Sequence, residues 1–170
     1  MKVEIFEKVL SEDVFEKIKN FFMDINTVWF YQPKMVYFSN KEDRGFFSHG
    51  LFHENRIYSP AYELMFPLLE KLNAISIIQI RANLNIKSEN PYESEFHNDY
   101  TYDEALTAIY YLNKCNGYTQ FDDDKKTKVF SESNKLAVFN CKLKHKTVSQ
   151  TDENRRLLIN INYFPKKLAT

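Results

Sequence analysis

The sequence predicts one α+β domain that is mainly β, a barrel or sandwich supported on one side by helices near its N-terminus. Apolar residues recur at helical spacing before residue 74, whereas alternation of period two with β-branched and aromatic residues follows up to Phe164. The 170 residues are 44% apolar, which suffices for one core, and three glycines leave no flexible linker. We therefore expect a single domain over 1–170, with helical support over about 1–74 and a β core over about 75–164.

Two helices are expected in the first part of the chain. Ser11 can cap a helix over 11–25, and Glu12 and Asp13 suit its first turn. Its apolar positions at helical spacing are Val14, Ile18, Phe21, Phe22 and Ile25. A second helix over about 61–71 follows Ser59-Pro60, and its apolar stripe is Leu64, Leu68 and Leu72. Each helix is expected to pack one face on the β core.

Four strands are expected at 81–86, 107–113, 135–139 and 156–164, with turns at 113–118, 122–126 and 149–154. The last strand is two-faced. One face carries Leu157, Ile159, Ile161 and Tyr163, and the other carries Arg156, Leu158, Asn160 and Asn162. The apolar face should meet the helices. Because Arg81, Asn83 and Asn85 repeat the polar pattern on the first strand, the polar faces predict a polar-lined pocket, whose side chains need either a ligand or one another as partners.

Composition excludes several functions. The 23 basic and 23 acidic residues cancel, so no bulk charge favours a nucleic acid or an anionic membrane. No apolar run approaches the length of a membrane span, and charges interrupt the N-terminus where a signal peptide would be apolar. Cys115 and Cys141 lack metal or disulfide spacing, which is typical of a reducing compartment. We expect a soluble cytoplasmic protein; abundant Lys and Asn, typical of AT-rich coding, favour a bacterial or viral source, and a viral protein would act in the host cytoplasm.

The motif His97-Asn98-Asp99 places an imidazole and a carboxylate on the same side of an extended segment after the first strand. His145 lies between the third and fourth predicted strands. A barrel that joins these strand ends would bring two histidines and one carboxylate to a point. Such a facial triad suits Fe(II), because it leaves three coordination positions open, whereas zinc prefers a tetrahedron.

These three residues, followed by Arg156 on the closing strand, resemble the HxD…H…R motif of the Fe(II)/2-oxoglutarate-dependent dioxygenases. The likeness is to the prolyl-hydroxylase-like branch and its small phage-encoded members, and it covers about 75–164. It implies a double-stranded β-helix, the jelly-roll or cupin-like barrel, in which Fe(II) binds His97, Asp99 and His145. It also implies 2-oxoglutarate as co-substrate with O2, the distal carboxylate being held by Arg156. Arg155, of opposite strand parity, is the alternative.

Further segments carry the resemblance. Ile109-Tyr110-Tyr111-Leu112-Asn113 is similar to the IYYLN strand of the prolyl-hydroxylase-like members, which implies that Tyr111 also binds the distal carboxylate. Gly117-Tyr118-Thr119-Gln120-Phe121 resembles a GG-x-x-F turn, with Tyr118 replacing the second glycine. The family often has a tyrosine near Asn85 that touches the co-substrate, and here the polar residues are Asn83 and Asn85. Asn160 and Asn162 are expected to line the cavity beside Arg156.

Three other groups have simpler interpretations. His49 and His53 are spaced as on a zinc-protease helix, but Gly50 stands where the catalytic glutamate would be, so we interpret both as loop residues. The aromatic stretch 46–52 either borders a substrate entrance or folds into the core. The acidic run Asp122-Asp123-Asp124 predicts a solvated hairpin tip, because it lacks the later glutamate of a calcium loop.

The resemblance implies hydroxylation of a C–H bond with release of succinate and carbon dioxide, on a peptidyl substrate, for example proline, or on another molecule. A protein or peptide is the expected partner, and a nucleobase ranks lower. Two alternatives stay open: a non-catalytic β-helix that serves as a binding or virion-associated module, and a cupin-like metal protein that does not use 2-oxoglutarate. Affinity for 2-oxoglutarate separates the last of these from the dioxygenase.

Overall fold

A computed structural model describes residues 2–34 and 44–166 of the chain. Within these ranges the chain is mainly β, with helices in its N-terminal part. The elements are β1 (Glu4–Glu7), α1 (Glu12–Met23), β2 (Phe30–Gln32), β3 (Phe46–His53), β4 (Arg56–Ile57), the 3-10 helix η1 (Pro60–Met65), α2 (Phe66–Lys71), β5 (Ala74–Ile86), β6 (Leu106–Tyr111), β7 (Tyr118–Phe121), β8 (Lys128–Phe130), β9 (Lys135–Asn140), β10 (His145–Val148) and β11 (Arg155–Pro165).

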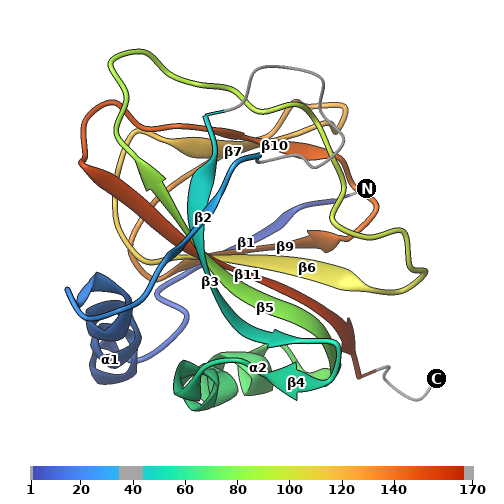
Figure 1. Cartoon of the computed structure of the whole chain (residues 1–170). Coiled ribbons are helices and arrows are strands. Elements are labelled where there is room, and N and C mark those ends of the chain that lie inside the picture. The colour runs from blue at the N-terminus through green and yellow to red at the C-terminus, as the bar shows by residue number, and fades with distance from the viewer. Residues whose placement is uncertain (1, 35–43, 167–170) are drawn as a thin grey trace.

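Two antiparallel sheets face each other (Figure 1). The larger has the order β1-β9-β6-β11-β5-β3-β2, with β4 paired to β3, and the smaller has the order β10-β7-β8. The smaller sheet lies across the top in Figure 1, and the helices lie on the opposite side of the larger sheet. Isolated bridges from Glu93 to Val148 and from His97 to His145 add the segment after β5 to the smaller sheet. The fold is therefore the predicted jelly-roll-like barrel with helical support.

The alternation of β11 separates two cores, as predicted. Leu157, Ile159, Ile161 and Tyr163 belong to a cluster with the buried helical side chains of Phe15, Ile18, Phe22 and Leu68. Leu158, on the other face, packs with Tyr111 and Phe121 between the two sheets. Burial of apolar surface on both faces of one sheet is the main stabilising contribution. The polar residues of β11 consequently point into the space between the sheets.

The N-terminal part is less helical than the expected support over 1–74, because it also contributes four strands. β3 lies directly beside β5 in the larger sheet, with Phe47 opposite Leu84 and Gly50 opposite Arg81. The interpretation of His49 and His53 as loop residues is therefore wrong. A register shift between Gly50 and Phe52 breaks the alternation of β3, and this bulge hides the strand from a period-two pattern.

The first helix is shorter than predicted, and the second covers its predicted range but is divided. α1 ends at Met23, and Ile25 beyond it is 96% exposed. Ser11 occupies the N-cap position, but its side chain makes no capping hydrogen bond. The second helix is divided into η1 and α2, and Pro67 lies in the first turn of α2. Proline lacks the N–H that a continuous helix would use there, which explains the break.

Asn134 joins the N-terminal segment to the barrel and gives a first testable prediction. Its Oδ1 accepts hydrogen bonds from the Leu10 N–H at 3.1 Å and from the Tyr110 hydroxyl at 2.7 Å, and its Nδ2 donates to the Leu10 carbonyl at 2.8 Å. Asn134→Ala removes all three and should lower the free energy of unfolding by about 2–4 kcal/mol. Urea denaturation measures the free energy of unfolding, with the exposed Asn26→Ala as the control. If both variants lose the same free energy of unfolding, Asn134 does not stabilise the junction between the N-terminal segment and the barrel.

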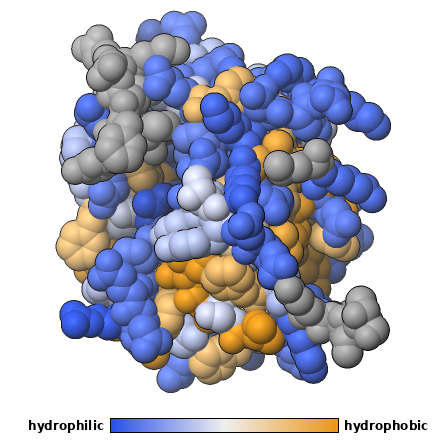
Figure 2. All heavy atoms as spheres, turned by 90° about the vertical axis from the view of Figure 1, so that its right-hand side faces the viewer, coloured by the Kyte–Doolittle hydropathy of each residue, from blue (hydrophilic) through white to orange (hydrophobic). Residues whose placement is uncertain are grey.

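No helix in the described ranges has the length and apolar content needed to cross a bilayer. On the face shown in Figure 2, hydrophilic side chains cover most of the surface and hydrophobic ones gather in the lower half.

Candidate metal centre and co-substrate cavity

His97 and His145 are direct cross-strand neighbours. Their backbones exchange two hydrogen bonds, His97 N–H to the His145 carbonyl at 3.0 Å and His145 N–H to the His97 carbonyl at 2.8 Å. Residues paired in this way project their side chains to the same side, and the two ring centroids lie 4.7 Å apart. The pairing of the segment after β5 with β10 thus brings the two histidines together.

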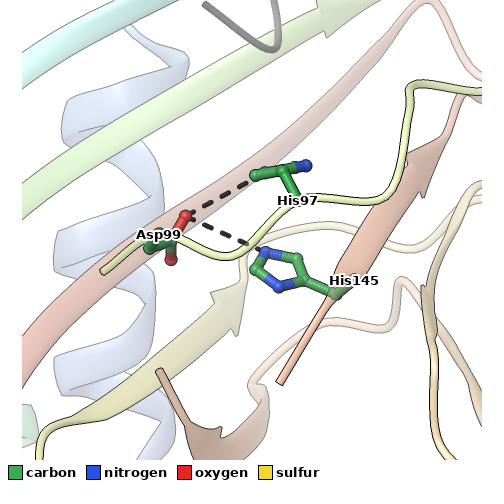
Figure 3. A group of neighbouring side chains, drawn as sticks. All are labelled: His97, Asp99 and His145. Carbon is green, nitrogen blue, oxygen red and sulfur yellow. Dashed lines mark ion pairs between the residues drawn. The ribbon is translucent and has the colours of Figure 1, made fainter. Parts of the chain in front are cut away.

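Asp99 completes the cluster (Figure 3). Its Oδ1 lies 4.0 Å from Nε2 of His97 and 3.9 Å from Nε2 of His145. Its other oxygen, Oδ2, accepts a hydrogen bond from Asn160 Nδ2 at 3.0 Å and lies 3.3 Å from the Thr107 hydroxyl, whose single proton is shared with Asn162 Oδ1 at 2.7 Å. The carboxylate is therefore held by one oxygen and presents the other to both imidazoles.

The histidine rings are held in a matching way. Nδ1 of His97 lies 3.1 Å from the Glu95 carbonyl, and Nδ1 of His145 lies 3.2 Å from the Leu143 carbonyl. A carbonyl only accepts, so each Nδ1 carries a proton, and in the neutral form of each ring Nε2 has the lone pair. Metal-bound histidines typically have this arrangement, in which the second nitrogen donates to a carbonyl or carboxylate.

Burial and charge favour the ligand forms of these groups. Burial acts to raise the pKa of Asp99, but His145, His97, the hydrogen bond from Asn160 and the Arg81 charge outweigh it and lower that pKa. Burial lowers the pKa of His145, although the Asp99 charge partly opposes this. An ionised carboxylate beside a neutral imidazole is what metal binding requires.

These donors fit a divalent metal ion. The nearest ligand atoms of His97, Asp99 and His145 all lie within 4.8 Å of one another. Two imidazole nitrogens and one carboxylate oxygen, with the remaining side open to a cavity, are the donor set that non-haem Fe(II) sites use.

The support of Asp99 gives a second prediction. Asn160→Ala removes the hydrogen bond that orients Asp99 and should weaken metal binding about tenfold to a hundredfold, because metal ligands depend on such supporting bonds. Anaerobic titration with Ni(II), followed calorimetrically, measures the change. Asn26→Ala, on the exposed turn after α1, is the control. An unchanged affinity would show that Asp99 does not need Asn160.

A cavity between the sheets extends from the three ligands. In the described part of the chain its wall is formed by Phe46, Arg81, Asn83, Asn85, Ser94, His97, Asp99, Ile109, Thr119, His145, Thr147, Leu158 and Asn160. Both polar strand faces predicted from the sequence contribute to it. Because β5 and β11 are neighbours, with Asn160 opposite Arg81 and Arg156 opposite Asn85, these faces form one continuous floor.

Arg156 lies under one end of this floor and is 0% exposed. Its guanidinium donates to the hydroxyls of Thr147 at 2.6 Å and Thr119 at 3.2 Å, and the two threonines are paired on β10 and β7. Its Nε has no hydrogen-bond partner. A buried guanidinium with an unsatisfied donor, beside two hydroxyls that line the cavity, is an arrangement that suits a carboxylate.

Tyr111 supports this group from behind. It is fully buried, its hydroxyl donates to Thr119 Oγ1 at 2.8 Å, and the Arg156 guanidinium lies 5.7 Å from its ring centre. Burial raises the pKa of Tyr111, so its hydroxyl stays a donor. Tyr111 is absent from the cavity wall, and its hydroxyl reaches the cavity through Thr119.

Strand parity separates the two adjacent arginines. Arg155 is exposed, and its Nη1 reaches the Met23 carbonyl at 3.5 Å, away from the cavity. The stem of Arg156 is confined by Gly117, where an added Cβ would lie 3.0 Å from Arg156 Cδ. Gly117 therefore leaves the room that the arginine occupies.

The four asparagines differ in position. Asn83, Asn85 and Asn160 line the cavity. Asn162 lies behind it, where it donates to Asn160 Oδ1 at 2.9 Å and accepts from the Thr107 hydroxyl at 2.7 Å. Asn162 is thus placed to orient Asn160.

Sequence reasoning missed the threonines. Thr107 contacts Asp99, and Thr119 and Thr147 contact Arg156. Threonine is common in strands for reasons of shape, so a single one carries no signal in the sequence. The register of β7 and β10, which brings two threonines to one point, would have been needed to find them.

No family model matches the sequence, and no curated protein matches it. Solved structures do match. An oxidoreductase of the 2OG-Fe(II) oxygenase family from Burkholderia pseudomallei aligns with a TM-score of 0.70 and 10% identity, over 95% of this chain and 84% of that one. A prolyl hydroxylase from Trichoplax adhaerens, in complex with a peptide fragment of a hypoxia-inducible factor, aligns with a TM-score of 0.64 and 16% identity, over 95% of this chain and 83% of that one. HygX from Streptomyces hygroscopicus, with nickel and 2-oxoglutarate bound, aligns with a TM-score of 0.62 and 15% identity, over 96% of this chain and 83% of that one.

The fold of this chain is that of the 2OG-Fe(II) oxygenases, including prolyl hydroxylases, which confirms the fold predicted from the sequence. The chain carries a group of two histidines and one aspartate that is suited to a metal ion and lines the cavity between the sheets.

Proposed function

We propose that the protein is an Fe(II)- and 2-oxoglutarate-dependent dioxygenase that hydroxylates a C–H bond. One observation carries the proposal: the group of His97, Asp99 and His145 lines a cavity whose wall also includes Thr119 and Thr147, the two threonines that accept hydrogen bonds from the buried Arg156. In this proposal the three side chains hold Fe(II), and Arg156 holds the distal carboxylate of 2-oxoglutarate. Similar solved structures that bind this co-substrate support the assignment.

Iron, 2-oxoglutarate and O2 together supply the oxidant, with succinate and carbon dioxide as co-products. The chain's own residues bind and orient. Arg156 offers a planar pair of donors to the carboxylate, with the hydroxyls of Thr119 and Thr147 beside it, and Tyr111 fixes Thr119. The hydrogen bond from Asn160 helps to keep Asp99 ionised and oriented, and Leu158 and Ile109 give the cavity wall an apolar part.

The substrate is proposed to be a peptidyl side chain, proline foremost. Support comes from the Trichoplax prolyl hydroxylase, whose structure contains a peptide. We also propose a cytoplasmic location, since Cys115 and Cys141 are both buried free thiols, as is typical of a reducing compartment.

Anaerobic titration with Fe(II) and then 2-oxoglutarate tests the proposal. Bidentate binding of the co-substrate should produce a weak visible charge-transfer band that Fe(II) alone does not give. If the protein mixed with Fe(II) and 2-oxoglutarate shows neither the band nor affinity for 2-oxoglutarate, the dioxygenase is excluded. Binding of iron alone would then indicate a cupin-like metal protein, and no binding of iron would indicate a non-catalytic binding module.

A further inference from the structure

Arg81 is a second arginine of the cavity, and the proposed reaction does not use it. It lies on β5 opposite Asn160 of β11 and opposite Gly50 of β3, so it stands at the metal end of the polar floor. Arg156 is opposite Asn85, four residues away along β5, which separates the backbones of the two arginines by about 13 Å.

The guanidinium of Arg81 makes no hydrogen bond with the described residues, although its charge acts on the carboxylate of Asp99. Its Nε is buried without a hydrogen bond, and it forms no ion pair within that part of the chain. The guanidinium carbon lies 5.3 Å from the centre of the Phe46 ring, which also lines the cavity. An aromatic face holds an arginine in place without using its donors. Arg81 as a whole is half-buried, but a buried Nε–H without an acceptor indicates that a ligand oxygen is missing.

Asn83, the next residue on the same face, has a buried acceptor without a partner, whereas Arg81 has a buried donor without one. Its Oδ1 is buried and has no hydrogen-bond partner, although Asn83 also lines the cavity. Two adjacent polar side chains on one wall therefore lack partners. Because buried polar groups are normally satisfied, this wall is suited to a ligand with charged oxygens and a neighbouring polar group.

The charged groups around the cavity indicate the sign of the charge that this ligand carries. Asp99 is the acidic group of the described wall, whereas Arg81 on the wall and Arg156 at its end are both basic. A divalent metal ion and the 2-oxoglutarate dianion cancel each other, so the loaded cavity keeps one positive charge in excess. In a site of low dielectric such a charge is costly unless an anion accompanies it.

We propose that Arg81 is a specificity-determining residue that binds a carboxylate of the primary substrate beside the metal, with Asn83 contacting a neighbouring polar group. The inference rests on the proposed function and narrows its substrate to an acid. Arginine suits this role, because its planar fork matches a carboxylate. A neutral prolyl side chain alone would leave the buried Nε–H of Arg81 without an acceptor.

The test uses protein loaded with Ni(II) and 2-oxoglutarate and two panels of probes, N-acetyl amino acids and their amides. Ligand-observed NMR gives the affinities. At least one acid should bind about tenfold to a hundredfold more tightly than its amide. Arg81→Gln should remove this preference, whereas Arg155→Gln, which changes an exposed arginine on β11, should keep it.

Other outcomes overturn the inference. If no acid is preferred over its amide, Arg81 does not select a carboxylate. If phenyl phosphate binds through Arg81 more tightly than every acid, the substrate group is a phosphate instead. If Arg81→Gln weakens 2-oxoglutarate binding itself, Arg81 serves the co-substrate. Failure of the unmutated protein to bind 2-oxoglutarate would be a separate result, against the proposed function.

Discussion

His97→Ala is expected to abolish metal binding at concentrations that saturate the unmutated protein, a loss of more than about a hundredfold in affinity. The reason is geometric. His97 provides one of the three donors around a single point, and among the described residues no other histidine, cysteine or carboxylate joins this group. Its side chain is only partly buried, so the variant should stay folded, in contrast to a change at the buried His145. Anaerobic calorimetry with Fe(II) or Ni(II) measures the affinity.

His53→Ala is the matched control, because His53 is also a half-buried histidine but lies on β3, outside the cluster. It should bind metal as the unmutated protein does. Circular dichroism of both variants shows whether the fold is retained. Full metal binding by folded His97→Ala would refute the proposed centre.

Arg156→Gln should raise the dissociation constant for 2-oxoglutarate about a hundredfold and leave metal affinity unchanged. The substitution removes the charge and the planar fork, and charge-assisted hydrogen bonds of this kind contribute about 1.5–3 kcal/mol each. Arg156→Lys should recover only part of the affinity, because an ammonium group cannot bind a carboxylate through two parallel bonds. Titration of the Ni(II)-loaded protein with 2-oxoglutarate measures both.

Arg155→Gln is the comparison, since Arg155 is exposed and of opposite parity on the same strand. It should leave 2-oxoglutarate affinity within about twofold of the unmutated value, as surface substitutions generally do. A larger loss in Arg155→Gln than in Arg156→Gln would reverse the assignment and contradict the strand parity on which it depends.

The sequence predicted the parts of the fold that regular alternation determines. β11 shows it best: its two faces separate as its residue pattern indicates, Leu157 toward the helices and Arg156 toward the cavity. β3 was missed, because a bulge at Gly50 interrupts its pattern. β1 was missed because all four of its residues are exposed at the edge of a sheet, so no apolar face marks them.

The candidate site was predictable where its residues have rare chemistry in a fixed order, as in His97, Asp99 and His145. What could not be predicted is the register between distant strands. The contacts of Thr119 and Thr147 with Arg156, and the lack of a hydrogen-bond acceptor for Arg81 Nε among the described residues, depend on which residues lie opposite one another across two sheets. Such pairings are tertiary, and one sequence does not encode them in any local pattern.

The direct opposition of His97 and His145 has a consequence for how the molecule melts. The two ligands belong to segments far apart in the chain, and isolated bridges at Glu93 and His97 attach the first segment to the smaller sheet. An ion held by both would tie the long connection after β5 to β10, much as a cross-link closes a loop. Since the unfolded chain has no such site, bound metal adds to the free energy of unfolding, about 2.7 kcal/mol at one hundred times its dissociation constant. The ion would thus stabilise the fold of the barrel in addition to taking part in catalysis.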